Sequence, residues 1–219
     1  SSASSARRRG ANSDPARAAV SAVAGAPLPY WRLSGFYFAY FALLGGVAPF
    51  LSLYFESLGF SPARIGELVA IPMLMRCIAP NLWGWLGDAT GQRLLIVRVG
   101  ALLTALCFAG IFWRQDYWWL AAIMALHSFF WHAVLPQFEA ITLAHLGSQS
   151  ARYSQLRLWG SVGFILTVVL PGLLLQRAGM AVYPMAMFGI MLLIAVCSTL
   201  VPQPPRQPAS AAVAGDGDA

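Results

Sequence analysis

The sequence GWLGDATGQR, residues 84–93, is a short polar turn between two long apolar runs. The run before the turn covers Pro62–Leu86, and the run after it covers Leu94–Trp113. A helix needs roughly 20 mostly apolar residues to cross the hydrocarbon core of a bilayer. Both runs reach that length, so the turn predicts two membrane-spanning helices joined by a tight loop.

Four further apolar runs have spanning length, and short polar segments separate all of them. They cover Leu33–Phe55, Trp118–Leu143, Ser154–Leu175 and Ala181–Val201. Before the second run, Ser61 is a suitable N-cap and Pro62 a suitable first helical residue. The pattern predicts an all-α membrane protein whose six transmembrane helices occupy residues 30–201.

The composition excludes most other classes of protein. The chain is 58% hydrophobic and 10% charged, whereas soluble domains carry about 25% charged residues. Its net charge of +6 comes from arginines without any lysine. Apart from a triplet at residues 7–9, these arginines mostly occur singly near the ends of apolar runs, as membrane topology requires. A nucleic-acid partner is therefore not expected, and the lipid bilayer is.

The cysteines indicate neither a metal site nor a disulfide framework. Cys77, Cys107 and Cys197 all lie within apolar runs, and their spacing fits neither zinc ligands nor disulfide pairs. They are expected to be small buried apolar side chains. We predict no metal and no organic cofactor.

The arginines also predict how the chain is oriented. An even number of spans places both termini on one side, and that side holds nine arginines against three on the other. The positive-inside rule then predicts cytoplasmic termini in a cell membrane, for which a bacterial inner membrane is expected. Residues 1–29 and 202–219 are rich in small residues and proline, and we predict that both segments are disordered and cytoplasmic.

Three charged residues fall deep inside apolar runs, where isolated charges are costly and usually functional. Arg157 lies in the stretch YSQLRLWGSVG, residues 153–163, and Glu139 lies in the preceding run. Arg76 lies in the second run, from which it could either extend toward the membrane surface or face a central cavity. Arg98, one turn inside the third run, is expected only to extend to the surface.

A polar stripe follows one side of the helix that carries Glu139. At about 100° per residue, Ser128, His132, Glu139 and Thr142 fall within about 80° of one another. Such a stripe should face protein or a wet cavity. His132 could relay a proton or pack against a neighbouring helix. His127 lies on a different face, which argues against a shared metal site.

Gly84, Asp88, Gly91 and Arg93 resemble the loop signature of the major facilitator superfamily, Gly-x-x-x-Asp-x-x-Gly-x-Arg, which lies between its second and third helices. The resemblance implies a cytoplasmic gate whose charges close that side and release it during alternating access. The chain departs from many members at Gln92, where a basic residue is common. The resemblance also implies that the chain is the N-terminal six-helix half of a twelve-helix fold. Each such half is a 3+3 inverted repeat.

Two further runs are similar to the lactose permease branch, the oligosaccharide-proton symporters. They are the Pro-x-x-Glu-Ala run that ends in Glu139 and Ala140, and the Arg-x-x-Gly-x-x-Gly run that begins at Arg157. The second run resembles the phenylpropionate permease family still more closely, and so does the arginine at position 76. The resemblance implies that Glu139 and Arg157 bind substrate, with Arg76 and His132 as further candidates.

These features predict a secondary active transporter and not an enzyme, because no cluster of catalytic residues or metal ligands is visible. The deep charges include one more cation than anion, which favours a small anionic or polar solute such as an aromatic acid, a sugar or a nucleoside. A proton is the expected coupling ion. The alternative is a non-transporting six-helix membrane protein, either a sensor or a partner-binding half.

The family places its substrate between two six-helix halves, and this chain contains one. The missing half could be the C-terminal part of a longer polypeptide or a second copy of the chain. A first residue of Ser1 fits the first possibility better. We therefore expect a partner half with the same architecture.

Overall fold

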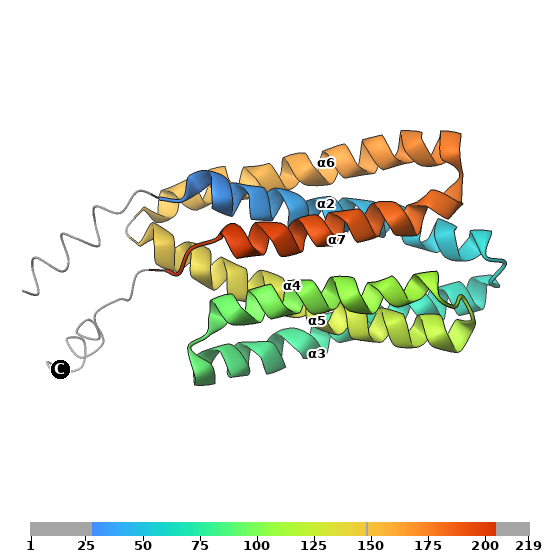
Figure 1. Cartoon of the computed structure of the whole chain (residues 1–219), viewed down its shortest axis with the longest axis horizontal. Coiled ribbons are helices and arrows are strands. Elements are labelled where there is room, and N and C mark those ends of the chain that lie inside the picture. The colour runs from blue at the N-terminus through green and yellow to red at the C-terminus, as the bar shows by residue number, and fades with distance from the viewer. Residues whose placement is uncertain (1–27, 148, 205–219) are drawn as a thin grey trace, which may run out of the picture.

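The computed structural model describes residues 28–147 and 149–204, and six long helices dominate this part of the chain (Figure 1). They are α2 (Tyr30–Ser57), α3 (Pro62–Thr90), α4 (Arg93–Ala109), α5 (Tyr117–Leu146), α6 (Tyr153–Ala178) and α7 (Tyr183–Leu200). Short 3-10 helices at Gly110–Phe112, Ser150–Arg152 and Met180–Val182 adjoin α4, α6 and α7. All six long helices could cross a membrane by length and composition, which confirms the predicted fold class. The predicted disorder at the two ends falls almost wholly outside the described residues.

The helices form two groups of three that lie against each other (Figure 1). In one group α2 packs between α6 and α7, and in the other α5 packs between α3 and α4. Contacts between α4 and α7 join the two groups. The first residues of α2, the last residues of α7 and the α3–α4 turn all lie at one end of the bundle, which we call the terminal end.

The packing follows the predicted 3+3 repeat. The repeat is tested by exchanging each of α2, α3 and α4 with α5, α6 and α7 in turn. The α2–α6 contact then becomes the α5–α3 contact. The α2–α7 contact becomes the α5–α4 contact. The α4–α7 pair maps onto itself. Because an offset of three helices reverses the direction of the chain, this is the arrangement expected of an inverted repeat.

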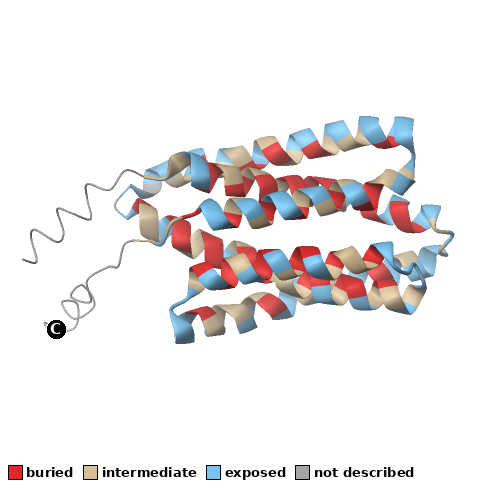
Figure 2. Ribbon diagram, in the orientation of Figure 1, coloured by how far each residue is buried: buried red, intermediate tan, exposed pale blue. Residues whose placement is uncertain are grey.

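Burial is distributed unevenly over the helices (Figure 2). In their most apolar segments, half of the residues of α2 and α4 are buried, but only 22% of those of α6 and 11% of those of α3. The outer faces of α3 and α6 therefore find little protein to pack against within this body.

The start and the end of α3 follow from local sequence. Ser61 has an extended backbone at the N-cap position, and Pro62 begins the helix as predicted. The predicted end at Leu86 is wrong, because α3 continues to Thr90, beyond the apolar run. It stops where Gly91 adopts a left-handed conformation, with φ 65°. Only two residues separate α3 from α4, so the predicted turn is tight.

Close contact between α2 and α6 depends on glycine. A Cβ atom added at Gly163 of α6 would lie 2.3 Å from the carbonyl oxygen of Phe38, and one added at Gly45 of α2 would lie 2.5 Å from that of Phe164. The two backbones therefore approach too closely for any other residue at these positions. Small residues of this kind let membrane helices pack without a hydrophobic driving force.

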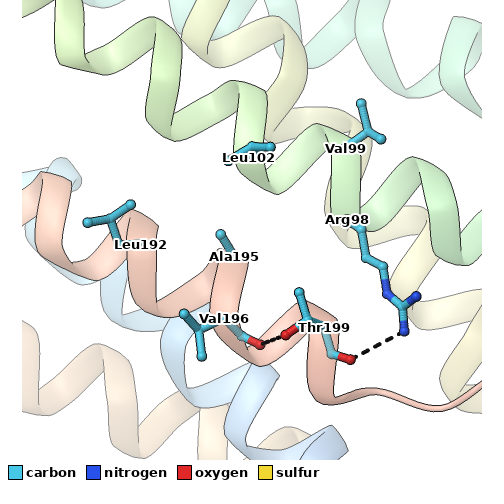
Figure 3. Close-up of a pocket in the computed structure, with 7 residues that line it drawn as sticks. All are labelled: Arg98, Val99, Leu102, Leu192, Ala195, Val196 and Thr199. Atoms are coloured by element: carbon cyan, nitrogen blue, oxygen red, sulfur yellow. Dashed lines mark hydrogen bonds between the residues drawn. The ribbon is translucent and has the colours of Figure 1, made fainter.

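Arg98 ties α4 to the last turn of α7. Its guanidinium group donates hydrogen bonds to the carbonyl oxygens of Ser198, Thr199 and Val201, at 3.3, 3.3 and 2.9 Å. Figure 3 shows the hydrogen bond to Thr199. The last carbonyl groups of a helix have no partner within the helix. The expectation that Arg98 merely extends to the membrane surface is wrong, because these carbonyl groups give it partners within the protein.

We expect Arg98→Met to loosen the end of α7. The substitution keeps the apolar stem but leaves the terminal carbonyl groups of α7 without the cation, which should cost roughly 2 kcal/mol. Hydrogen-deuterium exchange should accelerate over residues 195–201, and the thermal midpoint in detergent should fall. Arg177→Met, at the exposed end of α6, is the matched control and should change neither quantity.

Candidate functional site

α5 and α6 bring the two predicted charges together. Nη1 of Arg157 lies 3.1 Å from Oε1 of Glu139, and it donates a hydrogen bond to that oxygen. About a third of each side chain is exposed, 38% for Arg157 and 34% for Glu139. The pair is therefore neither buried in the core nor free at the surface. It lines a partly open face of the bundle, where a solute could reach it.

Aromatic side chains surround the pair. The Tyr153 hydroxyl donates to Oε1 of Glu139 at 3.2 Å. The guanidinium carbon of Arg157 lies 4.4 Å from the ring centroid of Phe41 and 5.9 Å from that of Tyr37. The sequence pattern assigns a role to none of these three residues. Tyr153 precedes Arg157 by one helical turn, so helix geometry would have found it, whereas the two α2 residues are brought in only by tertiary packing.

The polar stripe of α5 faces protein, as predicted. Ser128 and Thr142 are fully buried. The Thr142 hydroxyl donates to the Phe138 carbonyl oxygen at 2.9 Å and accepts a hydrogen bond from the Tyr37 hydroxyl at 3.3 Å. His132 is half-buried. Among the described residues, no group of three or more His, Cys, Asp or Glu is placed to hold a metal ion.

Arg76 is exposed on α3, and within the described part of the chain it forms no hydrogen bond or ion pair. Arg76 therefore does not contact the Glu139–Arg157 pair. Whether it binds substrate stays a prediction.

The turn between α3 and α4 holds the two charged residues of the loop signature together as an ion pair. Nη2 of Arg93 bonds to Oδ1 of Asp88 across the turn. A Cβ atom at Gly87 would lie 2.5 Å from the side chain of Gln137, so this glycine permits close approach of α5. At Gly84, by contrast, nothing lies within 4 Å of the Cβ position. Gly84 faces away from the neighbouring helices.

Gln137 is a polar residue to which sequence analysis gave no role. Its side chain is buried, with 1% of the residue exposed. Oε1 accepts a hydrogen bond from Nη1 of Arg93, and Nε2 donates to the carbonyl oxygen of Trp83, both at 3.0 Å. An amide two residues before Glu139 in an apolar helix is the only sequence signal for this contact.

A separate cavity of about 400 Å³ lies between α4 and α7 near Arg98 (Figure 3). Its other walls are mostly aliphatic, from residues such as Leu102 and Leu192. None of the predicted site residues lines it, so it is distinct from the charged pair.

The sequence is similar to known transporters. A profile of the MFS_1 like family matches residues 30–215. The maltose permease of Geobacillus stearothermophilus is 32% identical over 176 residues, which are 78% of this chain and 43% of that protein. A probable 3-phenylpropionic acid transporter of Escherichia coli (strain K12) is 29% identical over 178 residues, 79% of this chain and 46% of that protein.

The fold is also that of a transporter half. The crystal structure of the nucleoside transporter NupG (D323A mutant) matches with a TM-score of 0.71 at 19% identity, over 84% of this chain and 47% of the other. The chain thus spans less than half the length of each of these relatives. It is an integral membrane protein, and it belongs to the MFS_1 like family of the major facilitator superfamily, a group of transporters and not of enzymes.

Proposed function

We propose that this chain is the N-terminal half of a secondary active transporter and carries the charges that bind its substrate. The observation that carries the proposal is the Glu139–Arg157 pair, formed between two spanning helices and one-third exposed. Charges at this depth are tolerated where they face one another and a polar cavity. The cavity would open first to one side of the membrane and then to the other as the two halves move.

The proposed substrate is a small polar or anionic organic solute, such as an aromatic acid or a sugar. The planar guanidinium of Arg157 suits a carboxylate or a pair of neighbouring hydroxyl groups. The nearby rings of Phe41, Tyr37 and Tyr153 offer flat apolar faces for an aryl group or a sugar ring. The names of the two sequence relatives support these two classes, an aromatic acid and a disaccharide.

A second six-helix body is the proposed partner. α3 and α6 bury the smallest share of their apolar residues, and both expose large aliphatic side chains such as Leu74 and Ile165. The chain spans 43% and 46% of the two relatives, which supports a partner of similar size within one longer polypeptide. The sequence distribution of arginines, nine on the predicted side of the termini against three on the other, supports cytoplasmic termini in a bacterial inner membrane.

The proton is the proposed coupling ion, with Glu139 as its carrier. When Arg157 turns to the substrate, the carboxylate loses its counter-ion, and a proton is the proposed replacement. We expect Glu139→Gln to lose accumulation driven by a pH gradient and to retain more of its substrate exchange, because a neutral amide keeps an acceptor oxygen for the substrate but cannot carry the proton. The measurement compares exchange and gradient-driven uptake in the same vesicles, and accumulation at the wild-type level would exclude this carrier.

Uptake into vesicles tests the proposed function directly. The protein made from its native gene is reconstituted, and radiolabelled 3-phenylpropionate and maltose are supplied with and without an inward proton gradient. We expect saturable uptake of one of them that the gradient increases. If neither these compounds nor other aryl acids and sugars enter or bind, the chain is not a transporter of this class.

A further inference from the structure

We propose that Gln137 is a positioning residue that couples the α3–α4 turn to Glu139, so that the turn and the charged pair change state together. The inference rests on the proposed function, because it describes how the substrate site would be regulated. It starts from the two hydrogen bonds of a buried amide.

The surroundings of the Gln137 amide match its size and its hydrogen-bonding groups. Gln137 bonds to the side chain of Arg93, at the start of α4, and to the backbone of Trp83, in the last two turns of α3. Gly87 leaves the space that the amide fills, because a Cβ atom there would clash with Oε1. Arg93 bonds at the same time to Asp88. Gln137 therefore joins α5 to the ion pair of the turn.

Gln137 and Glu139 lie on different sides of α5. The two residues are separated by about 200° around the helix and by about 3 Å along it. Gln137 therefore faces α3 and α4, whereas Glu139 faces α6 and pairs with Arg157. A single turn of α5 thus connects the two contacts, and a turn of helix moves as a rigid unit.

α5 is weakened just before this turn. Pro136 lies inside the helix and cannot donate the hydrogen bond that the carbonyl group of His132 would otherwise accept. The end of α5 from Gln137 to Leu146 can therefore tilt relative to the rest. Release of Gln137 by the turn would allow this tilt, and the tilt would shift Glu139 against Arg157.

Gln137→Met tests the coupling, because methionine keeps the length of the side chain but forms neither hydrogen bond. Two lost hydrogen bonds should raise the frequency of local opening about tenfold. We expect hydrogen-deuterium exchange to accelerate by that factor in residues 83–93 and also in residues 137–146. Gln115→Met is the matched control, since it removes an amide hydrogen bond to Tyr54 at the opposite end of the bundle. It should change neither segment.

The outcomes separate coupling from local packing. Acceleration confined to residues 83–93, or none in either segment, would overturn the proposal. Should Gln137→Met not assemble, Gln137→Asn makes the same test, because its shortened amide cannot reach both partners. In Gln137→Met we further expect the maximal uptake rate of the transported compound to fall about tenfold, and the affinity for that compound to change by a smaller factor. Absence of all uptake by the wild-type protein would refute the proposed function but leave the exchange result valid.

Discussion

Uptake should be lost when Arg157 is replaced by glutamine, although the protein still inserts and folds. The substitution removes the cation that pairs with Glu139 at 3.1 Å and that lies over the ring of Phe41. Losing a hydrogen bond to a charged group costs about 1.5–3 kcal/mol, so we expect transport to fall at least about tenfold. The measurement is the initial rate of uptake in vesicles that contain equal amounts of wild-type and variant protein.

The control for this experiment is Arg177→Gln. Arg177 lies at the exposed end of the same helix, and its loss removes the same charge from the chain without touching the pair. This variant should transport at the wild-type rate. Wild-type uptake by Arg157→Gln would refute the assignment of Arg157 to the substrate site.

The second large effect is expected at Gly163, where valine should prevent stable packing of α6 on α2. Its Cβ atom would lie 2.3 Å from the Phe38 carbonyl oxygen, and backbone cannot move aside as a flexible side chain could. Overpacking of this kind typically costs 1–3 kcal/mol, and a clash with backbone lies at the upper end, about 3 kcal/mol. The thermal midpoint in detergent and the yield of monodisperse protein should both fall.

Gly189→Val provides the comparison for this substitution. Gly189 is also a helical glycine, in α7, but nothing lies within 4 Å of its Cβ position. It should tolerate valine with little change in thermal midpoint. Equal behaviour of the two variants would show that the close approach of α2 and α6 does not support the fold.

The fold was predictable from the sequence because a bilayer constrains it so strongly. Runs of apolar residues had to become helices, because backbone groups in lipid must form hydrogen bonds within the segment. The turn at residues 84–93 marked the boundary between two spanning helices and carried the family resemblance. The ends of helices were less predictable. α3 extends through a polar segment to Thr90, since hydrogen bonds within a helix do not require apolar residues and only the left-handed Gly91 stops it.

The candidate site was predictable only in part. Charge in an apolar run identified Glu139 and Arg157, because burial of a charge is costly whatever the tertiary structure. The contacts of Gln137 with Arg93 cross 44 residues of sequence, and no local pattern encodes them. Whether Arg76 is exposed likewise depends on which helices pack against α3. The apolar pattern does not specify those neighbours.

The central claim is that Glu139 and Arg157 face an aqueous cavity that a solute can enter. Reaction of the wild-type protein with a water-soluble carbodiimide, followed by mass spectrometry of each acidic residue, tests it most directly. We predict that Glu139 is modified alongside the exposed Glu56 and Glu67, and that the transported solute slows the reaction of Glu139 alone. An unmodified Glu139 in protein whose Glu56 and Glu67 react fully would contradict the claim.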